Sequence, residues 1–493
     1  MSGTGRLGVV DALVLSGVAA LPWFWGGTDL ASTRLVAALL AAAGAWLAVR
    51  ESARAIFPRR SRALWLTALA LAGLGALQST PLPEPLVAAV SPEAHRKARE
   101  SYPVPGAPGA AWLGALERDA REAVPEASAA APPAAPARPA EPAPGARRFL
   151  TLSLAPDTTR EMTFWFVALY VAFAVISRRC RDAFRFEAYQ TAMFALFTTL
   201  AVVSLANRLT APATILWLGT APVDAKPFGP YVNATHFAGA MELGVPWMMG
   251  YSFSRLARRG RGAAPSATTI LATFGWIVGF VAAIVAASKT AALLLLASAS
   301  VLLVRALRQR RPGRLRVGAV VAALAAVAVL VVVSGSYLGE RVAAFRDIYG
   351  ESLLTNDRLI AWRAALPMVA DYWAVGSGLG AFVTVFPSYL PAGEPGIWGQ
   401  AHSDWLELAA GGGALGLALV LALLAVYARR LQRAIRTETA SRGALVGAAL
   451  GLGALTLHAL VDFNHQIPAN ALLFVATAAW ASSRSESGEE TDA

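Results

Sequence analysis

Residues 268–287 read TTILATFGWIVGFVAAIVAA and contain no charged side chain. A helix of that length spans about 30 Å, which is the thickness of the hydrocarbon core of a bilayer. Residues 317–334 and 443–460 are similarly long and apolar. Since such runs greatly exceed what a soluble helix needs, the sequence predicts an integral membrane protein built from helical spans.

The composition agrees with this prediction. Of the 493 residues, 56% are hydrophobic and 15% are charged, whereas about a quarter of the residues in a soluble domain are charged. The single cysteine, Cys180, excludes an intramolecular disulfide. The first apolar run has no small-residue cleavage site, so we expect a retained span and not a signal peptide. We predict an all-α, polytopic protein with about twelve transmembrane helices, at residues 9–26, 35–49, 63–78, 162–177, 189–206, 237–254, 268–287, 291–304, 317–335, 413–428, 443–461 and 466–482.

The distribution of basic residues predicts the orientation of these spans. The net charge of +12 comes from short arginine clusters between apolar runs, which argues against a nucleic-acid surface and is typical of loops that face anionic lipid. Five loops that would share one side hold 24 Lys and Arg residues, while the four short loops opposite hold four: Arg34, Arg208, Lys226 and Lys289. The positive-inside rule therefore predicts that both termini are cytoplasmic.

Two long segments would then lie on the outer side. Residues 79–161 include a Pro/Ala-rich stretch at 124–145, which favours an extended linker. Residues 336–412 mix apolar, aromatic and charged positions, so we expect a folded, partly helical outer loop before the tenth span. A helix is predicted at 357–372, kinked or ended by Pro367, and a second helix near His402 should lead into the tenth span.

The expected organisation follows from these boundaries. The sequence shows no internal repeat, so it gives no support to an inverted-repeat transporter. The predicted regions are spans one to three at 1–78, an outer loop at 79–161, spans four to nine at 162–335, a second outer loop at 336–412, spans ten to twelve at 413–483 and a cytoplasmic tail at 484–493.

The outer segment 336–412 also contains a recognisable set of motifs. It reads DRLIAW at 357–362, GSGLGAF at 376–382, FPSY at 386–389 and HSDWLE at 402–407. This order resembles the O-antigen ligase and polymerase family. Further matching stretches are QSTPLPEPLVAAVSP at 78–92, LSLAPDTTRE at 152–161, FGPYVNATHFAGAMELGVP at 228–246, SKTAALLLL at 288–296 and HALVDFNHQIPANALLF at 458–474.

The resemblance implies an activity and a place in the cell. Such proteins have a membrane fold of the GT-C type and lie in the bacterial inner membrane. They transfer a glycan from undecaprenyl diphosphate to lipid A–core, to another lipid-linked glycan or to a protein, at the periplasmic face. By motif position their functional residues fall on Lys289, Arg358 and His402 of this chain. Two positions depart from the family pattern: Lys289 replaces an Arg, and Ser403 replaces a common Asn.

Physical chemistry supports these three positions as catalytic candidates. A diphosphate leaves readily once cations neutralise its developing charge, and no metal is needed for that. Arg358 offers a planar fork for phosphate oxygens, and Lys289 offers a mobile point charge. His402 has two roles open to it, as a base toward the acceptor hydroxyl or as an imidazolium that holds phosphate.

Weaker candidates surround them. Asp404 and Glu407 share a helix face and can orient His402, or they are simply first-turn acids that favour the helix dipole. The remaining candidates for substrate binding are Arg363, His236, Asp462 and His465. For the histidines and Asp462 the alternative is hydrogen bonding between helices.

The sequence predicts no metal and no cofactor. It contains no His-x-x-His spacing, and the glycines at 376, 378 and 380 fit a tight turn better than a nucleotide loop. We therefore expect an inverting, metal-independent glycosyltransferase, either ligase or polymerase. The partners would be the lipid bilayer, the undecaprenyl-linked glycan and a saccharide acceptor. The alternative is a lipid-linked glycan flippase or another polytopic transporter.

Overall fold

The computed structural model describes residues 6–51, 61–100, 149–222, 225–258, 264–308, 357–391 and 399–484. This part of the chain is mainly helical, with two short antiparallel strand pairs, β1 (Leu82–Pro83) with β2 (Phe149–Leu150) and β3 (Thr214–Ile215) with β4 (Gly219–Thr220). The predicted linker at 124–145 and the ninth span at 317–335 lie outside the described residues.

Six described helices are long and apolar enough to cross a membrane. They are α2 (Leu30–Arg50), α8 (Pro156–Arg179), α9 (Ala183–Thr210), α11 (Ala267–Val285), α12 (Lys289–Arg308) and α16 (Asp404–Thr437). The other predicted spans in the described ranges also coincide with helices: α1 (Val9–Ala20), α4 (Arg62–Ser79), α10 (Ala234–Arg258), α17 (Arg442–His458) and α18 (Pro468–Ser482). The all-helical membrane class is thus confirmed, and the count of twelve spans stays a prediction.

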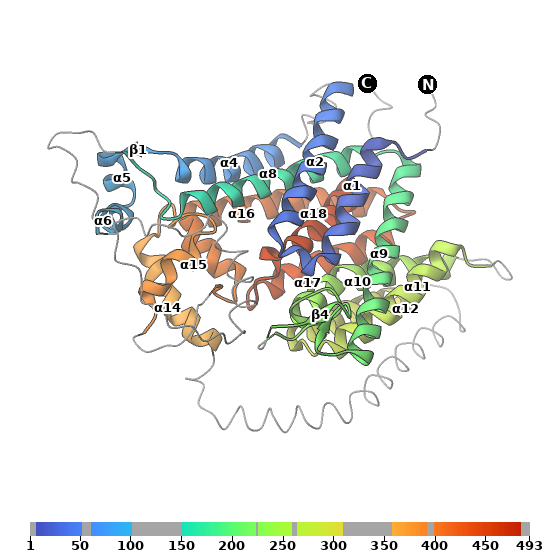
Figure 1. Cartoon of the computed structure of the whole chain (residues 1–493). Helices are drawn as coiled ribbons and strands as arrows, with labels where there is room; N and C mark the ends of the chain where they lie inside the picture. Colours follow the sequence, from blue (N-terminus) through green and yellow to red (C-terminus); the bar gives the residue numbers. More distant parts are fainter. Residues whose placement is uncertain are drawn as a thin grey trace.

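Small residues allow the central helices to pack closely. Helix α10 is buried along most of its length and packs against α9, α11, α12 and α17. A Cβ on Gly447 of α17 would lie 2.1 Å from the backbone oxygen of Pro246 in α10. Glycine at this position therefore permits backbone contact between the two helices, a common solution in membranes. Helices α4, α8, α16 and α18 lie side by side next to this centre (Figure 1).

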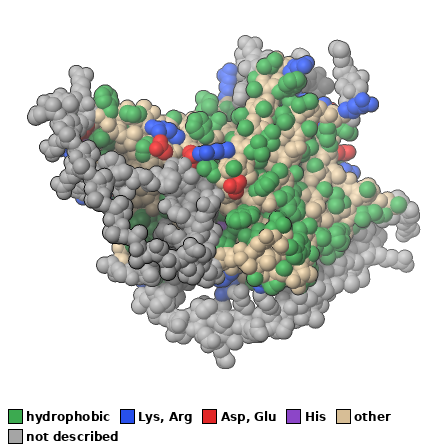
Figure 2. Space-filling view, viewed as in Figure 1, with side chains coloured by type: hydrophobic (Ala, Val, Ile, Leu, Met, Phe, Trp, Pro, Cys, Tyr) green, Lys and Arg blue, Asp and Glu red, His purple; other side chains and the backbone are tan. Residues whose placement is uncertain are grey.

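The surface of the bundle is apolar, as a lipid-facing surface should be. Large side chains such as Leu35, Phe164 and Leu293 are each at least 60% exposed. Figure 2 shows hydrophobic side chains spread over the described face of the bundle, with few charged side chains among them. Because soluble monomers rarely expose such large apolar areas, this surface supports a membrane location.

Several arginine-rich helix ends lie together. Arg179 at the end of α8 pairs with buried Asp11 in α1, at 2.6 Å, and Arg185 in α9 contacts the same carboxylate at 3.3 Å. Arg258 at the end of α10 donates to the backbone oxygen of Ala440, 2.6 Å away, in the turn before α17. Loops that were predicted to share one side are therefore linked in space, and their assignment to the cytoplasm remains a prediction.

The segments predicted to lie outside the bundle fold at one end of it. Helices α5 (Glu84–Val90), α6 (Pro92–Glu100), α14 (Asp357–Asp371) and α15 (Phe382–Val385) gather there (Figure 1). A separate small core joins α6, α14 and α15 and includes Ala94, Ala361, Met368, Phe386 and Ala401. The sequence predicted α14 but not α5 and α6, because α5 has only seven residues and α6 is almost entirely polar, so neither shows an apolar periodicity.

Three helices differ in detail from the expected ones. Pro367 does not end α14, which continues to Asp371; an exposed proline leaves the carbonyl four residues before it open to solvent, so the helix tolerates the lost bond. Helix α16 begins at Asp404, as predicted, but Gly413 interrupts its helical dihedrals with φ 61° and ψ −166°. The first span ends early, at Ala20, and continues as the short 3₁₀ turns η1 (Leu21–Trp23) and η2 (Trp25–Gly27).

Candidate functional site

A buried carboxylate lies at the centre of the candidate site. Asp462, in the turn between α17 and α18, has a side chain that is 3% exposed. Its Oδ2 atom lies 3.8 Å from Arg358 Nη2 in α14 and 3.7 Å from His458 Nε2 in α17. Its Oδ1 atom lies 3.7 Å from His236 Nε2 in α10 and accepts a hydrogen bond of 2.8 Å from the backbone of Phe463. Three helices thus converge on one carboxylate.

The surrounding groups keep Asp462 ionised. Burial alone would raise the pKa of this carboxyl, but the neighbouring His236, His458 and Arg358 outweigh burial and hold the pKa well below its usual range. Asp462 therefore supplies a permanent negative charge beside the guanidinium of Arg358, whose side chain is 42% exposed. This charge fixes the position of an arginine that is accessible from outside.

His402 lies on the same side of the turn as Arg358. The ring of Phe463 contacts both His402, at a centroid distance of 5.3 Å, and His236, at 4.6 Å. Trp362, four residues after Arg358 and hence on the same face of α14, donates from Nε1 to the backbone oxygen of Ala401, 2.9 Å away. The structure thereby brings together two of the three predicted catalytic residues, which are separated by 44 positions in sequence.

The backbone at His402 is strained. Its φ is +53°, in the left-handed region that a non-glycine residue adopts at a cost of about 1–2 kcal/mol. The next residue, Ser403, caps α16, because its side chain accepts a hydrogen bond from the backbone nitrogen of Leu406. Asparagine, the usual family residue at that position, is an equally good cap, so this departure preserves the local structure.

Behind Asp462 lies a second, fully buried layer. His458 Nδ1 and Glu242 Oε1 are 2.8 Å apart, and their side chains are 1% and 0% exposed. Asn470 donates to the backbone oxygen of His236 at 2.8 Å, and Tyr231 donates to Asn470 at 3.0 Å. Tyr231 and Asn470 were not predicted, although a polar side chain within an apolar span is itself a signal of such a network.

Lys289 and Arg363 are placed differently. Lys289 is the exposed first residue of α12, which packs against α10 and α17, the helices that carry His236 and His458. Arg363 is exposed and follows Arg358 by five residues, so it points about 140° away around the helix. Their participation in the site remains a prediction.

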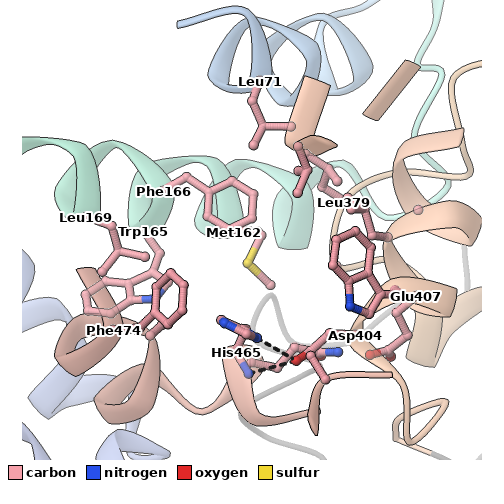
Figure 3. Close-up of a pocket in the computed structure, with 18 of the residues that line it drawn as sticks. Leu71, Met162, Trp165, Phe166, Leu169, Leu379, Asp404, Glu407, His465 and Phe474 are labelled. Atoms are coloured by element: carbon pink, nitrogen blue, oxygen red, sulfur yellow. Dashed lines mark hydrogen bonds and ion pairs between the residues drawn. The ribbon is translucent and has the colours of Figure 1, made fainter. Parts of the chain in front are cut away.

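Asp404, Glu407 and His465 line a separate cavity of about 300 Å³ between α4, α8, α16 and α18 (Figure 3). The sequence suggests Asp404 as a group that orients His402. In the structure its Oδ2 atom accepts hydrogen bonds from the backbone nitrogen of His465, at 2.9 Å, and from His465 Nδ1, at 3.0 Å. Glu407 lies 2.9 Å from the amide nitrogen of Gln400 when that amide is oriented to donate.

A glycine-rich turn holds this end of the protein together. Gly376, Gly378 and Gly380 all have positive φ, and a Cβ on Gly376 would lie 2.1 Å from the backbone oxygen of Gly411. The side chain of Gln78, at the end of α4, donates to the backbone oxygens of Val375 and Gly411 and accepts from Leu379. The glycines therefore form a tight turn after α14, as the sequence predicted, and this turn packs against α16.

In the described part of the chain, no group of three or more His, Cys, Asp or Glu side chains is arranged to hold a metal ion. The basic and imidazole groups around Asp462 are instead suited to an anionic ligand.

Comparison with known proteins identifies a region that contains part of this site. Residues 274–421 match the family model described as O-antigen ligase. The match includes Lys289, Arg358 and His402, while the turn that carries Asp462 and His465 lies beyond it. No curated protein matches the chain.

Proposed function

We propose that this chain transfers a glycan from undecaprenyl diphosphate to a saccharide acceptor. Its residues 274–421 match the O-antigen ligase family, which confirms the resemblance seen in the motifs. The acceptor is lipid A–core for a ligase or a lipid-linked glycan for a polymerase. Transfer takes place at the periplasmic face of a bacterial inner membrane, with both termini in the cytoplasm.

The observation that carries the proposal is the contact of Arg358 with Asp462, beside His402 and at one end of an apolar bundle. Asp462 holds the guanidinium while part of the Arg358 side chain remains accessible. A preorganised guanidinium stabilises the negative charge that develops on a departing diphosphate, and this is a large catalytic effect. A membrane location suits a donor whose lipid tail must remain in the bilayer.

The reaction we propose is a single displacement. The acceptor oxygen attacks the anomeric carbon on the face opposite the diphosphate, and the bond to the diphosphate breaks with its electron pair, which inverts the anomeric centre. Arg358 and Lys289 neutralise the leaving diphosphate, and Asp462 positions Arg358. We assign His402, whose ring contacts Phe463 beside Asp462, to the donor side, where it assists the phosphate.

The competing function is a flippase or another transporter. The family match is to an enzyme family, and it includes the three residues proposed for catalysis. This match favours glycan transfer over transport.

The test measures glycan transfer by purified protein in nanodiscs, with a lipid-diphosphate-linked donor and a saccharide acceptor. Arg358→Ala should lower the rate about a hundredfold or more, as expected when a cation that meets developing charge is removed. The matched control is Arg99→Ala, since Arg99 is an exposed arginine paired with Glu84 at 2.6 Å, away from the site.

The same assay decides between the candidate functions. Unchanged transfer by the double variant Arg358→Ala, His402→Ala, at normal expression, would exclude the proposed enzyme. EDTA should leave the rate of the wild-type protein unchanged. In a deletion strain, unattached glycan chains would indicate a ligase, and single repeat units would indicate a polymerase.

A further inference from the structure

The turn between α17 and α18 has two functional faces. Asp462 and Phe463 face Arg358, His236 and His402. Three residues after Asp462, His465 faces the cavity between the helices together with Asp404 (Figure 3). The turn therefore joins a cationic cluster to a second, nearby imidazole that the proposed donor chemistry does not use.

His465 is held in one tautomer and one orientation. Its Nδ1–H donates to Asp404 Oδ2 at 3.0 Å, and its ring packs edge-on against Phe474 at a centroid distance of 4.9 Å. Asp404 is itself fixed, because its backbone nitrogen donates to the oxygens of Ala459 and Asp462, 3.0 and 3.1 Å away. With Nδ1 committed to the carboxylate, the lone pair of Nε2 is available to accept a proton, as in other carboxylate-oriented imidazoles.

The polar groups of the cavity gather beside His465. Gln400, Glu407 and Gln466 line it with Asp404, whereas most other lining residues, such as Met162 and Phe166 on the opposite wall in Figure 3, are apolar. Asp404 Oδ1 is buried and accepts no hydrogen bond from a described residue. No lysine or arginine is among the described residues that line the cavity.

This lining selects against a diphosphate and in favour of a hydroxyl compound. The carboxylate of Asp404 repels an anionic group, and no lysine or arginine among the described lining residues offsets that repulsion. Carboxylate and amide oxygens accept hydrogen bonds from the hydroxyls of a sugar, and amide nitrogens donate to them. The two faces of the turn thus fit two different substrates, an anionic one at Arg358 and a neutral hydroxyl at His465.

We infer that His465 is the general base for the acceptor, with Asp404 as its positioning residue and the polar end of the cavity as the binding site for the acceptor sugar. The inference rests on the proposed function. His465 Nε2 takes the proton of the acceptor hydroxyl while the oxygen forms its bond to the anomeric carbon. The bond to the diphosphate breaks in the same step, and its electron pair leaves with the diphosphate beside Arg358. This assignment places His402 on the donor side.

The first experiment compares His465→Ala, Asp404→Asn and Arg358→Ala for transfer and for donor binding. His465→Ala should lower transfer by about a hundredfold or more, in the range typical of a lost general base, with donor affinity retained. Arg358→Ala should weaken donor binding as well. The matched control is His95→Ala, because His95 forms a similar pair with Glu84, with Nε2 2.9 Å from Oε1, outside the cavity.

A second experiment separates a base from a structural residue. In His465→Gly the cavity gains the volume of the missing ring, and free imidazole added to the assay should restore transfer in proportion to its concentration. Imidazole should not rescue His402→Gly. Donor binding by His465→Gly confirms that the variant is folded.

The outcomes distinguish this inference from the proposed function. If the wild-type protein and His465→Ala transfer glycan at the same rate, His465 is not the general base. The proposed function, glycan transfer, would still stand. Rescue of His402→Gly but not of His465→Gly would likewise overturn it. A wild-type protein that binds donor but transfers to no acceptor would instead contradict the proposed function.

Discussion

Gln78→Leu tests how the end of α4 holds the turn at 375–380 against α16. The side chain of Gln78 is fully buried, and its Nε2 atom donates to the backbone oxygens of Val375, at 2.6 Å, and Gly411, at 2.8 Å. Its Oε1 atom accepts from the backbone nitrogen of Leu379 at 3.0 Å. Leucine occupies a similar volume but offers none of these bonds, so the change removes hydrogen bonding with little change in packing.

The expected magnitude follows from the groups that lose their partners. The oxygen of Gly411 keeps a second donor, the backbone nitrogen of Gly378 at 3.1 Å. The oxygen of Val375 and the nitrogen of Leu379 keep none among the described residues. The buried nitrogen of Leu379 loses its partner at a cost of about 1–3 kcal/mol, and the oxygen of Val375, which is only partly buried, adds less, so the free energy of unfolding should fall by at least about 1–3 kcal/mol.

The assay is thermal unfolding in nanodiscs together with hydrogen exchange of the turn at 375–380. Exchange should accelerate there and at the start of α16, because both lose their common anchor, and glycan transfer should fall with it. Ser79→Ala is the control, since the Ser79 hydroxyl bonds only to carbonyls of its own helix, such as Gly75 at 2.9 Å. If Gln78→Leu unfolds at the same temperature as Ser79→Ala, with unchanged exchange of the turn, the proposed anchor is wrong.

Three further predictions concern the topology and the charges of the site. Reporter fusions after residues 339 and 433 should report opposite compartments, and two cytoplasmic signals would contradict the outer location of 336–412. Lys289→Arg should retain substantial transfer because it restores the usual family residue. Arg358→Lys should lose more transfer, because lysine cannot make the two-pronged phosphate contact of arginine. Equal transfer rates for both variants would refute this distinction. Asp462→Asn should destabilise the protein near neutral pH. Because the pKa of Asp462 is lowered in the folded protein, its contribution is present above the unfolded value of about 3.9 and is lost as pH falls, so the stability difference from wild type should shrink on acidification. A difference that grew toward acid pH would show that the carboxylate is not held ionised.

Apolar length and motif order, both local properties of the chain, determined the class of this protein and part of its site. A run such as 268–287 specifies a helix of bilayer length without reference to any other segment, because the backbone in lipid must satisfy its own hydrogen bonds. In the structure this run is α11, at Ala267–Val285. The candidates Arg358 and His402 were likewise visible as motif residues before their proximity was known.

Only the tertiary structure decided which side chains meet. Arg358 and Asp462 are 104 positions apart, and Gln78 and Val375 are 297 apart; no helical or strand periodicity relates positions so distant. Spacing within a helix suggested that Asp404 orients His402, yet the turn between α17 and α18 folds His465 against that carboxylate. The left-handed backbone of His402 also depends on this packing, because a residue with a Cβ adopts that conformation only at an energetic cost. Chain entropy opposes each of these contacts in isolation, and they persist because the packed helices fix both partners at once.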